Sequence, residues 1–293
     1  MISSRENRWL QSFRSALAGK SEGAVGIEGA RLVEEAFRSA VPVEAVLVSE
    51  SGRKHLGRVQ PLVGENTRIL ATTDKLFERL ADTESPQGIA ALIRPSAASF
   101  DDLLAGPATP LILVLVGVQD PGNVGTIIRS AEALGASGIA TCRAGSIGTA
   151  HPFSPKALRA SAGSVFRLPM LDGIGVAVLQ AQLRVMQVQI LAAVSGEDEA
   201  DANSVAPWQA DLRGAIALLI GNEGAGLPAD VASAADARIR IPLAPAYGSK
   251  SHRVESLNAA TAASILMYEA ARQRAASTRD FAATARPAGA HDQ

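Results

Sequence analysis

Three clusters of polar side chains in this sequence each follow an apolar, strand-like run and precede a helical pattern. They are Asn123–Arg129, Gly221–Gly224 and Glu255–Asn258. Amide, guanidinium, carboxylate and hydroxyl groups of this kind bind polar ligands and stabilise developing charge. In an open α/β sheet, ligands bind beyond the carboxyl ends of the strands. We therefore expect the three clusters to converge on one pocket.

The first cluster combines a helix start with an arginine. The stretch Asp120–Asn123 is rich in turn-forming residues, and Asn123 is the predicted N-cap of the helix that follows. Arg129 comes six residues later, in the second turn of that helix. It either points toward the same strand ends or is an ordinary surface charge.

The second cluster is a glycine-rich loop, Gly221–Gly226, in which the backbone can turn sharply and approach a ligand closely. The loop does not match Gly-x-Gly-x-x-Gly, and the chain has no Gly-x-x-x-x-Gly-Lys-Ser/Thr phosphate loop. The sequence therefore gives little support to a dinucleotide site. Glu223 either binds a hydroxyl or a cation, or caps a helix that begins near Leu227.

The third cluster precedes a long apolar helix. Ser256 is the predicted N-cap of this helix, and Asn258 falls in its first turn. Helix capping alone would explain both residues. A functional interpretation is favoured because the first two clusters occupy equivalent strand-to-helix junctions of the same sheet.

Metal chemistry and serine hydrolysis are both disfavoured. The histidines are scattered along the chain, at His55, His151, His252 and His291. Together with the single Cys142 they show no zinc-ligand spacing, so no metal is predicted. The sequence also lacks a Gly-x-Ser-x-Gly elbow.

The elements that must position the clusters alternate between strand and helix, which predicts a parallel sheet covered by helices. Apolar runs at 111–118 and 215–220 are typical of strands buried on both faces. Further strands are predicted at 139–141, 189–194 and 237–241, and helices at 124–134, 155–162, 174–183 and 257–274. Together these elements predict one domain over residues 111–274.

The first 95 residues predict a smaller α/β domain, with helices at 28–37 and 73–80, a strand at 43–48 and an apolar strand before Arg94. Residues 94–110 contain three prolines and many small residues, which is typical of a linker. We place the smaller domain at 1–95 and the linker at 96–110. The tail 275–293 lacks apolar periodicity and is expected to be mobile.

Bulk composition indicates a folded protein with little net charge. Hydrophobic residues make up 47% and charged residues 19%, and the formal net charge is −1. The overall charge therefore gives no reason to expect a polyanionic partner, although a local basic patch is compatible with it. Near the N-terminus, four basic residues either contact phosphates or form a solvated face: Arg5, Arg8, Arg14 and Lys20.

Three observations predict a cytoplasmic protein without a membrane span. One cysteine cannot form an intrachain disulfide, which fits a reducing compartment. The N-terminus lacks the apolar core of a secretory signal. The longest apolar run, 111–118, is far shorter than the roughly 20 residues that a spanning helix needs.

The three clusters, in this order, resemble the three motifs of the SpoU (TrmH-type) RNA 2′-O-ribose methyltransferases. The matching stretches are Asn-x-Gly-x-x-x-Arg at 123–129, Leu-Leu-Ile-Gly-Asn-Glu-Gly-x-Gly-Leu at 218–227, and Ile-Pro-Leu at 241–243 followed by Glu-Ser-Leu-Asn-Ala-Ala at 255–260. Residues 153–164 are also similar to the family, and residues 25–36 resemble its substrate-binding domain. The resemblance covers most of the chain.

This resemblance implies a C-terminal α/β sheet closed by a deep trefoil knot (SPOUT-type), preceded by a small α/β substrate-binding domain. It also implies homodimers and S-adenosylmethionine bound in the knotted loops. By position, the cofactor-binding residues are Gly221, Asn222, Ile241 and Leu257. The family's polar active-site positions fall on Asn123, Arg129, Glu223, Ser256 and Asn258.

Methylation of a ribose 2′-hydroxyl requires positioning of the reactants and loss of the hydroxyl proton. Arg129 matches the residue that is often assigned to activate this hydroxyl. A guanidinium with a pKa above about 12 is a poor base at neutral pH, so we prefer electrostatic stabilisation of the developing alkoxide. In this interpretation solvent or an RNA phosphate accepts the proton. The 2′-hydroxyl target also explains a preference for RNA over DNA.

The expected RNA contacts are Lys156, Arg159, Lys250 and Arg253. The last two lie in the stretch 244–253, which is longer than the corresponding connection in the family. Either its basic residues, which include His252, contact RNA phosphates, or the stretch obstructs access of the cofactor.

The sequence thus predicts an S-adenosylmethionine-dependent methyltransferase that acts on structured RNA. Ribosomal RNA is favoured because the additional N-terminal domain resembles those of rRNA-modifying members of the family. The alternatives are a tRNA-directed 2′-O-methyltransferase and an RNA-binding protein with the same fold but no turnover. A nucleotide-dependent oxidoreductase is disfavoured by the missing dinucleotide fingerprint.

Overall fold

The computed structural model describes residues 2, 4, 6–106, 108–195, 203–244 and 255–284. The chain forms two compact units. Unit 1 comprises Met1–Ser99, Asp120–Arg129 and Ala150–Met170, and unit 2 comprises Phe100–Gln119, Ser130–Thr149 and Leu171–Gln293. Each unit contains its own sheet and its own apolar core.

The described strands of unit 1 form one mixed sheet in the order β1-β4-β2-β3. Their bounds are Val25–Glu28 (β1), Val43–Val48 (β2), Arg68–Ala71 (β3) and Ile89–Ile93 (β4). Strand β4 pairs antiparallel with β1 and with β2, whereas β2 and β3 are parallel. Edge strand β3 is exposed at Arg68 and Ile69 and half-buried at its last two residues, in contrast to the fully buried β4.

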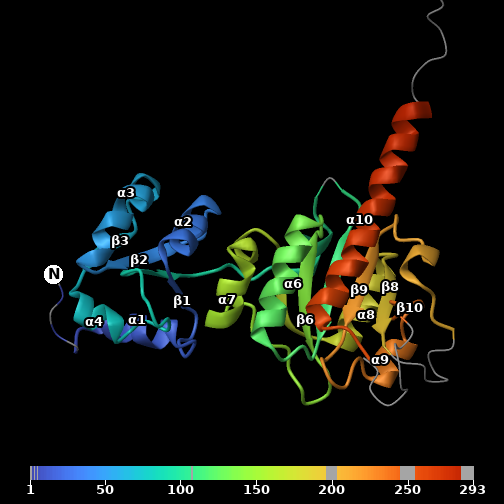
Figure 1. Ribbon diagram of the computed structural model, residues 1–293, viewed down its shortest axis with the longest axis horizontal. Helices are drawn as coiled ribbons and strands as arrows, with labels where there is room; N and C mark the ends of the chain where they lie inside the picture. Colours follow the sequence, from blue (N-terminus) through green and yellow to red (C-terminus); the bar gives the residue numbers. More distant parts are fainter. Residues whose placement is uncertain are drawn as a thin grey trace, which may run out of the picture. The chain divides into compact units, whose positions relative to one another are not determined.

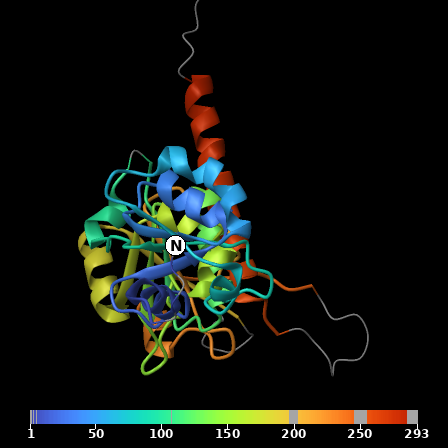
Figure 2. The same cartoon turned by 90° about the vertical axis from the view of Figure 1, so that its left-hand side faces the viewer.

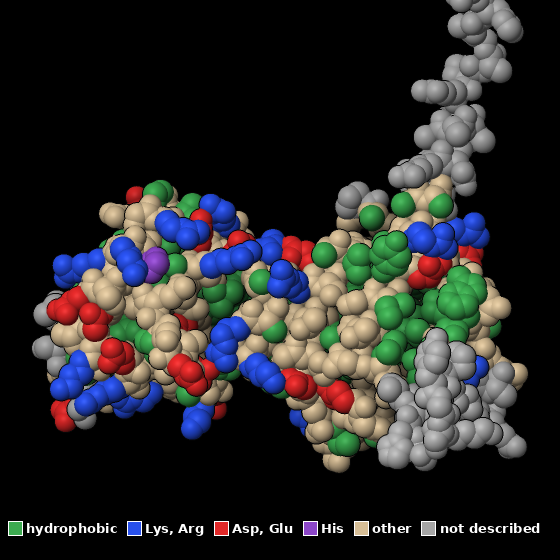
Figure 3. Space-filling view, viewed as in Figure 1, with side chains coloured by type: hydrophobic (Ala, Val, Ile, Leu, Met, Phe, Trp, Pro, Cys, Tyr) green, Lys and Arg blue, Asp and Glu red, His purple; other side chains and the backbone are tan. Residues whose placement is uncertain are grey.

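Helices cover both faces of this sheet, as Figures 1 and 2 show. The helices of unit 1 are α1 (Arg8–Leu17), α2 (Ala30–Arg38), α3 (Leu56–Val59), α4 (Asp74–Glu78) and α7 (Pro155–Ser161), with 3-10 turns η1 (Ser51–His55), η2 (Gln60–Leu62) and η3 (Ser164–Phe166). Helices α1 and α4 pack Leu10, Phe13 and Phe77 against alternate residues of β2 and β4. Basic and acidic side chains are interspersed on the visible face of this unit (Figure 3).

The described strands of unit 2 form a sheet in the order β10-β8-β9-β5-β6-β7. Their bounds are Leu111–Val116 (β5), Gly138–Arg143 (β6), Met170–Gly175 (β7), Gln189–Val194 (β8), Ile216–Ile220 (β9) and Ala237–Arg240 (β10). The pairings β10–β8, β8–β9, β9–β5 and β5–β6 are parallel. The carboxyl ends of β8, β9, β10 and β5 therefore lie at one edge of the sheet.

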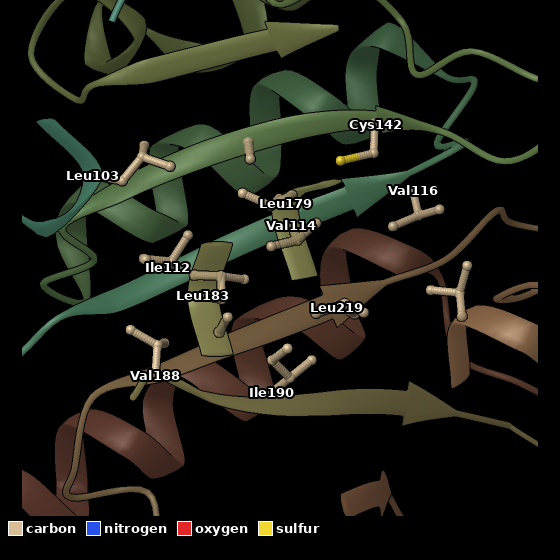
Figure 4. Packing of buried hydrophobic residues seen from close by; sticks show 13 residues of the cluster. Leu103, Ile112, Val114, Val116, Cys142, Leu179, Leu183, Val188, Ile190 and Leu219 are labelled. Atoms are coloured by element: carbon tan, nitrogen blue, oxygen red, sulfur yellow. The ribbon is translucent and has the colours of Figure 1, made fainter. Parts of the chain in front are cut away.

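Unit 2 has a core on each face of its central strands, which are apolar throughout. On one face, α5 (Phe100–Leu104) and α8 (Val176–Val185) pack Leu103, Leu179 and Leu183 against β5, β6, β8 and β9 (Figure 4). The remaining helices and turn are α6 (Pro121–Ala133), which begins in unit 1, α9 (Ala229–Ser233), α10 (Ala259–Thr284) and η5 (Pro207–Gln209). Helix α10 contacts β9, and its Ser264 hydroxyl lies 2.9 Å from that of Ser130 in α6.

The predicted class, a parallel α/β sheet with a small α/β domain before it, is confirmed. Several elements differ from the sequence-based expectation. The predicted helix 174–183 begins two residues later and is preceded by β7, which two glycines concealed. Residues 100–104 of the predicted linker form α5, with Leu103 fully buried. Helix α10 continues ten residues beyond Arg274 because the stretch after it is rich in alanine, the residue with the highest helix propensity.

Within the described ranges, no helix combines the length and the apolar character that a membrane span requires.

Candidate active site

A cavity of about 600 Å³ lies beyond the carboxyl ends of β8, β9 and β10 in unit 2. This size falls in the range of small-molecule sites, which is about 300–1,000 Å³. The walls come from the strand ends, the loop after β9, the stretch after β10 and the first turns of α10. The lining residues used below are Ser195, Ile220, Gly221, Asn222, Glu223, Arg240, Ile241, Glu255, Ser256, Leu257 and Leu266. The cavity thus combines apolar side chains with a few polar groups.

The loop after β9 folds back on itself, and Gly221 is the residue that permits this. A Cβ atom at Gly221 would lie 2.4 Å from the carbonyl carbon of Gly226 and 2.4 Å from the amide nitrogen of Leu227. Asn222 and Gly226 exchange two backbone hydrogen bonds of 3.0 Å, and Gly226 has a φ of +67°. Only glycine fits the first position, because any side chain would overlap the returning backbone.

The side chain of Asn222 holds this loop in place. Its Oδ1 accepts hydrogen bonds of 2.9 Å from the amides of Gly224 and Ala225, and its Nδ2 donates to the carbonyl oxygen of Gly117 at 2.9 Å. Gly117 follows β5, the strand next to β9 in the sheet. The Asn222 side chain therefore stabilises its own loop and connects it to the segment after β5.

Gly117 is fixed in turn by Thr149. The Gly117 amide donates to Thr149 Oγ1 at 2.9 Å, and this hydroxyl lies within hydrogen-bond distance of the carbonyls of Leu115 and Cys142. Gly117 has a φ of +72°, so an L-residue there would be strained. Sequence reasoning missed both Gly117 and Thr149, and the glycine directly after an apolar strand was the available signal.

Glu223 belongs to the same loop. One of its carboxylate oxygens accepts a hydrogen bond of 3.1 Å from the backbone amide of Gln119. The carboxylate therefore spans from the loop after β9 to the segment after β5. Its alternative role as a helix cap is wrong, because α9 begins at Ala229 rather than near Leu227. The expectation that it faces a binding site fits its place in the cavity lining.

The third cluster splits between the cavity and the helix start. Ser256 and Leu257 line the cavity, whereas Asn258 caps α10. Asn258 Oδ1 accepts from the amides of Ala260 at 2.9 Å and Thr261 at 3.2 Å. The prediction that Ser256 is the N-cap is therefore wrong, and Asn258 is the cap rather than a first-turn residue. The physical reason is that Asn258 reaches the two amides while the chain before it is still non-helical.

The first cluster lies in α6, within the part of that helix that belongs to unit 1. Helix α6 begins at Pro121, so Asp120 is its cap, and the predicted cap Asn123 is wrong by three residues. The carboxylate of Asp120 accepts from the Gly122 amide at 2.6 Å, and proline at the first helical position is favourable. Asn123 is partly buried, whereas Arg129, the ninth residue of the helix, is exposed. Arg129 makes no ion pair with another described residue.

Two of the expected RNA contacts are paired with carboxylates in unit 1. Lys156 Nζ lies 2.8 Å from Asp120 Oδ1, and Arg159 Nη1 lies 2.6 Å from Asp82 Oδ2. The hydrogen bond from Lys156, followed by the one from the Gly122 amide, lowers the pKa of Asp120. The other expected contacts, Lys250 and Arg253, and the neighbouring His252 lie outside the described residues.

The cavity therefore contains Gly221, Asn222, Glu223, Ile241, Ser256 and Leu257 from the predicted set. Sequence reasoning missed the contribution of Arg240 and of the residues at the end of β8, although the latter strand was predicted with its observed bounds. In the part of the chain that the structure describes, no group of three or more His, Cys, Asp or Glu side chains could hold a metal ion.

Comparison with known proteins gives two family matches. Residues 110–268 match the model of the SpoU rRNA methylase family, and residues 11–91 match that of the MRM3-like substrate binding domain. The first match alone spans more than half of the chain.

Individual proteins extend this similarity over nearly the whole chain. The 23S rRNA (guanosine(2553)-2′-O)-methyltransferase RlmP of Bacillus subtilis is 32% identical over 83% of this chain and 86% of its own. The SpoU methyltransferase AviRb from Streptomyces viridochromogenes, solved in complex with the cofactor AdoMet, has a TM-score of 0.75 at 27% identity and covers 92% of this chain and 100% of its own. An AdoMet-bound rRNA methyltransferase from Sinorhizobium meliloti has a TM-score of 0.74 at 28% identity, with 92% and 97% covered.

Proposed function

Because the chain belongs to the SpoU rRNA methylase family, we propose that it transfers a methyl group from S-adenosylmethionine to a ribose 2′-hydroxyl of structured RNA. The observation that carries the proposal is the cavity of unit 2, where the family's second and third motifs meet at the strand ends. Ribosomal RNA is the proposed substrate class, since relatives such as RlmP are named for it.

The cavity suits the cofactor in size and in chemistry. The close backbone turn at Gly221 leaves amide and carbonyl groups, rather than a side chain, to face an adenosyl group. Ile241 and Leu257 offer apolar contacts for its rings, and Asn222 keeps the loop in shape. We propose that these four residues hold S-adenosylmethionine, which when bound supplies a methyl carbon activated by the sulfonium.

The polar residues are proposed to act on the ribose and its 2′-hydroxyl. Arg129 binds the ribose oxygen through a charge-assisted hydrogen bond and stabilises the alkoxide that develops as the proton leaves. Solvent or an RNA phosphate accepts that proton. Asn123, Glu223 and Ser256 orient the ribose, and Asn258 positions Ser256 by fixing the start of α10. The oxygen–methyl bond forms as the methyl–sulfur bond breaks, and both electrons of the latter stay on sulfur.

The two parts of the chain take different tasks in this proposal. Residues 1–95 bind RNA, and residues 111–274 carry the methyltransferase site, in line with the two family matches at 11–91 and 110–268. Lys156 and Arg159 contact phosphates after exchanging their carboxylate partners Asp120 and Asp82. Lys250 and Arg253 are proposed to contact phosphates as well.

We also propose a homodimer with a trefoil knot in its methyltransferase domain, working in the cytoplasm. Helix α10 supports the dimer, because its Ile265 and Tyr268 side chains are 38% and 61% exposed. Large apolar side chains on the outer face of a helix favour burial against a partner. A second copy of this chain is the proposed partner.

Calorimetry with S-adenosylmethionine and tritiated-methyl transfer to unmodified RNA test this function. Purified protein is expected to bind the cofactor and to label 23S rRNA transcripts in preference to tRNA. Arg129→Ala is expected to lower kcat about 100-fold or more with unchanged cofactor affinity, the scale seen when one oxyanion donor is removed. Arg213→Ala is the control, since Arg213 is exposed and its one ion pair among the described residues is with Asp211, two positions before it. Cofactor binding without transfer to any RNA would instead support an RNA-binding protein without turnover.

A further inference from the structure

We propose that Arg8, Trp9 and Arg68 form a binding site for the phosphate backbone of structured RNA on unit 1. The inference rests on the proposed function, because it takes RNA as the ligand. Sequence reasoning left open whether Arg8 contacts phosphates or is simply solvated. The structure adds Arg68, which is 60 positions away in the sequence, to the same aromatic ring.

Both guanidinium groups are held on one indole. The Cζ atom of Arg8 lies 5.8 Å from the ring centroid of Trp9, and that of Arg68 lies 5.6 Å from it. Trp9 is only partly buried, and its inner side packs against the core cluster that contains Leu10 and Phe13. The ring is therefore anchored, and it fixes two otherwise mobile cations beside it.

A guanidinium held over an aromatic ring by a cation–π contact has no hydrogen-bond acceptor there, so its N–H donors stay available to a ligand. These donors match the oxygens of a phosphate in a bidentate geometry. The distances to the shared ring place the two Cζ atoms at most about 11 Å apart, comparable with the Debye length of about 8 Å at physiological salt. Charge recurs about every 3.4 Å of axis along one nucleic-acid strand, so the pair can engage phosphates of the same strand.

The local electrostatics favour an anion at this place. Arg8 is the first residue of α1, where the helix dipole is positive, and the first turn contains no acidic residue. A cation at a helix N-terminus is unfavourable, whereas an anion there is stabilised. Asn7 already caps the helix by accepting from the Trp9 amide at 2.9 Å, so the cap is not the role of Arg8.

Arg8 and Arg68 also differ in their partners from the paired basic residues of unit 1. Arg94 pairs with Glu44 at 2.9 Å, and Lys156 and Arg159 have carboxylates at 2.8 and 2.6 Å. Among the described residues, no carboxylate forms an ion pair with Arg8 or Arg68, although both are exposed. A phosphate can therefore bind them without first displacing an acid.

RNA is favoured over an acidic protein segment because the site joins paired guanidinium groups to an aromatic face. Nucleic-acid surfaces combine these two features, since guanidinium groups bind the phosphates and aromatic rings stack on exposed bases. A carboxylate-rich peptide would use only the charges. The experiments below distinguish these two partners.

Tryptophan fluorescence tests the site in the otherwise intact protein. The chain has two tryptophans, and Trp208→Phe leaves Trp9 as the sole emitter. Addition of an unmodified 23S rRNA transcript is expected to change the intensity or the wavelength of Trp9 emission in a saturable manner. Poly-glutamate of matched charge is expected to leave it unchanged. No change with RNA, or an equal change with poly-glutamate, would overturn the proposal.

The salt dependence of RNA binding gives a second measurement. Arg8→Gln/Arg68→Gln is expected to bind the transcript roughly tenfold more weakly at 0.1 M salt, with the slope of log K against log salt smaller by about 1.4–1.8. Arg94→Gln, an exposed and paired arginine of the same unit, is the control and is expected to keep the wild-type slope. A double variant that behaves like this control would reject the site.

The outcome separates this inference from the proposed function. S-adenosylmethionine affinity, measured by calorimetry, is expected to be the same in the wild type and the double variant. If the wild type neither binds the cofactor nor methylates RNA, the proposed function fails. If it does both and the double variant retains full RNA affinity, only the phosphate site fails.

Discussion

Gly221→Ala isolates the contribution of the loop after β9 to cofactor binding. The added Cβ would lie 2.4 Å from two backbone atoms and 2.6 Å from a third, all in Gly226 and Leu227. Ordinary van der Waals contact begins at 3.4 Å, so the returning backbone must retreat by about 1 Å. No flexible side chain is available to absorb this movement, because all three atoms belong to the main chain.

The expected loss of unfolding free energy follows from the hydrogen bonds that this movement breaks. Two backbone hydrogen bonds of 3.0 Å between Asn222 and Gly226 close the loop. Each contributes a net of about 0.5–1.5 kcal/mol, and overpacking adds about 1–3 kcal/mol. The protein can relieve the clash only by opening the loop, so we expect unit 2 to lose about 2–6 kcal/mol of unfolding free energy. Cofactor affinity is expected to fall about 10- to 100-fold, since about 1.4 kcal/mol corresponds to a factor of ten.

Urea denaturation and calorimetry with S-adenosylmethionine measure the two effects. Gly214→Ala is the matched control, because it adds the same methyl group before the amino end of β9, where nothing lies within 4 Å of it. The control is expected to match the wild type in both assays. If Gly221→Ala bound the cofactor as the wild type does and kept its stability, the close backbone turn could not be what shapes the cavity.

Two further predictions concern arginines of unit 2. Arg274 donates to four backbone carbonyls, and its partial burial lowers the pKa of its guanidinium. Arg274→Met leaves these carbonyls without their donor and is expected to cost about 2–4 kcal/mol of unfolding free energy in urea denaturation. The neighbouring Arg272→Met removes one ion pair in which the arginine is exposed, and Glu269 keeps its hydrogen bond from Gln273. This substitution is expected to cost less than about 1 kcal/mol, and a loss equal to that of Arg274→Met would contradict this account. The hydrogen bond from Arg213 lowers the pKa of Asp211 to about 2, so the stabilising contribution of the Asp211 carboxylate is present above its ordinary value of 3.8 and is lost as pH falls through about 2. Carboxyl NMR titration of Arg213→Gln is expected to show this pKa raised from about 2 toward 3.8, but still below it because the backbone amide of residue 213 continues to donate to Asp211; an unchanged value would refute the pairing.

The central strands of the unit 2 sheet could be predicted because they are buried on both faces. The runs at 111–118, 189–194 and 215–220 are continuous in apolar residues, and the structure places strands there within one or two residues. Strand β3 escaped prediction because it is an edge strand whose residues are partly or fully exposed. Burial, rather than strand propensity, was the readable signal.

Helix starts were less predictable, since several residues in a row could act as the cap. Asp120 and Asn123 both have side chains that accept hydrogen bonds from free amides, and Pro121 favours the earlier start. At α10, Ser256 and Asn258 competed in the same way, and Asn258 is the cap. Local propensity cannot choose between such candidates, because the choice depends on where tertiary packing fixes the helix.

Contacts between distant segments could not be read from the sequence at all. The bond from Asn222 to Gly117 joins residues 105 positions apart, and the ion pair of Arg159 with Asp82 joins residues 77 positions apart. Asn222 was expected to bind the cofactor, yet the nitrogen and the oxygen of its side-chain amide are both hydrogen-bonded to backbone groups. Its side chain therefore serves the cofactor indirectly, by holding the loop that forms the cavity.

The cofactor cavity and the proposed RNA contacts differ in how well they tolerate substitutions. The cavity is lined by residues of unit 2, and its shape depends on main-chain bonds, glycines and one buttressing amide. Arg8 and Arg68, by contrast, are exposed side chains on unit 1 that lie beside an aromatic ring and do not line this cavity. Surface charges can change without disturbing a core, whereas a glycine in close backbone contact cannot. Substitutions at Arg8 and Arg68 should therefore change how tightly RNA is bound, while the affinity for S-adenosylmethionine stays constant.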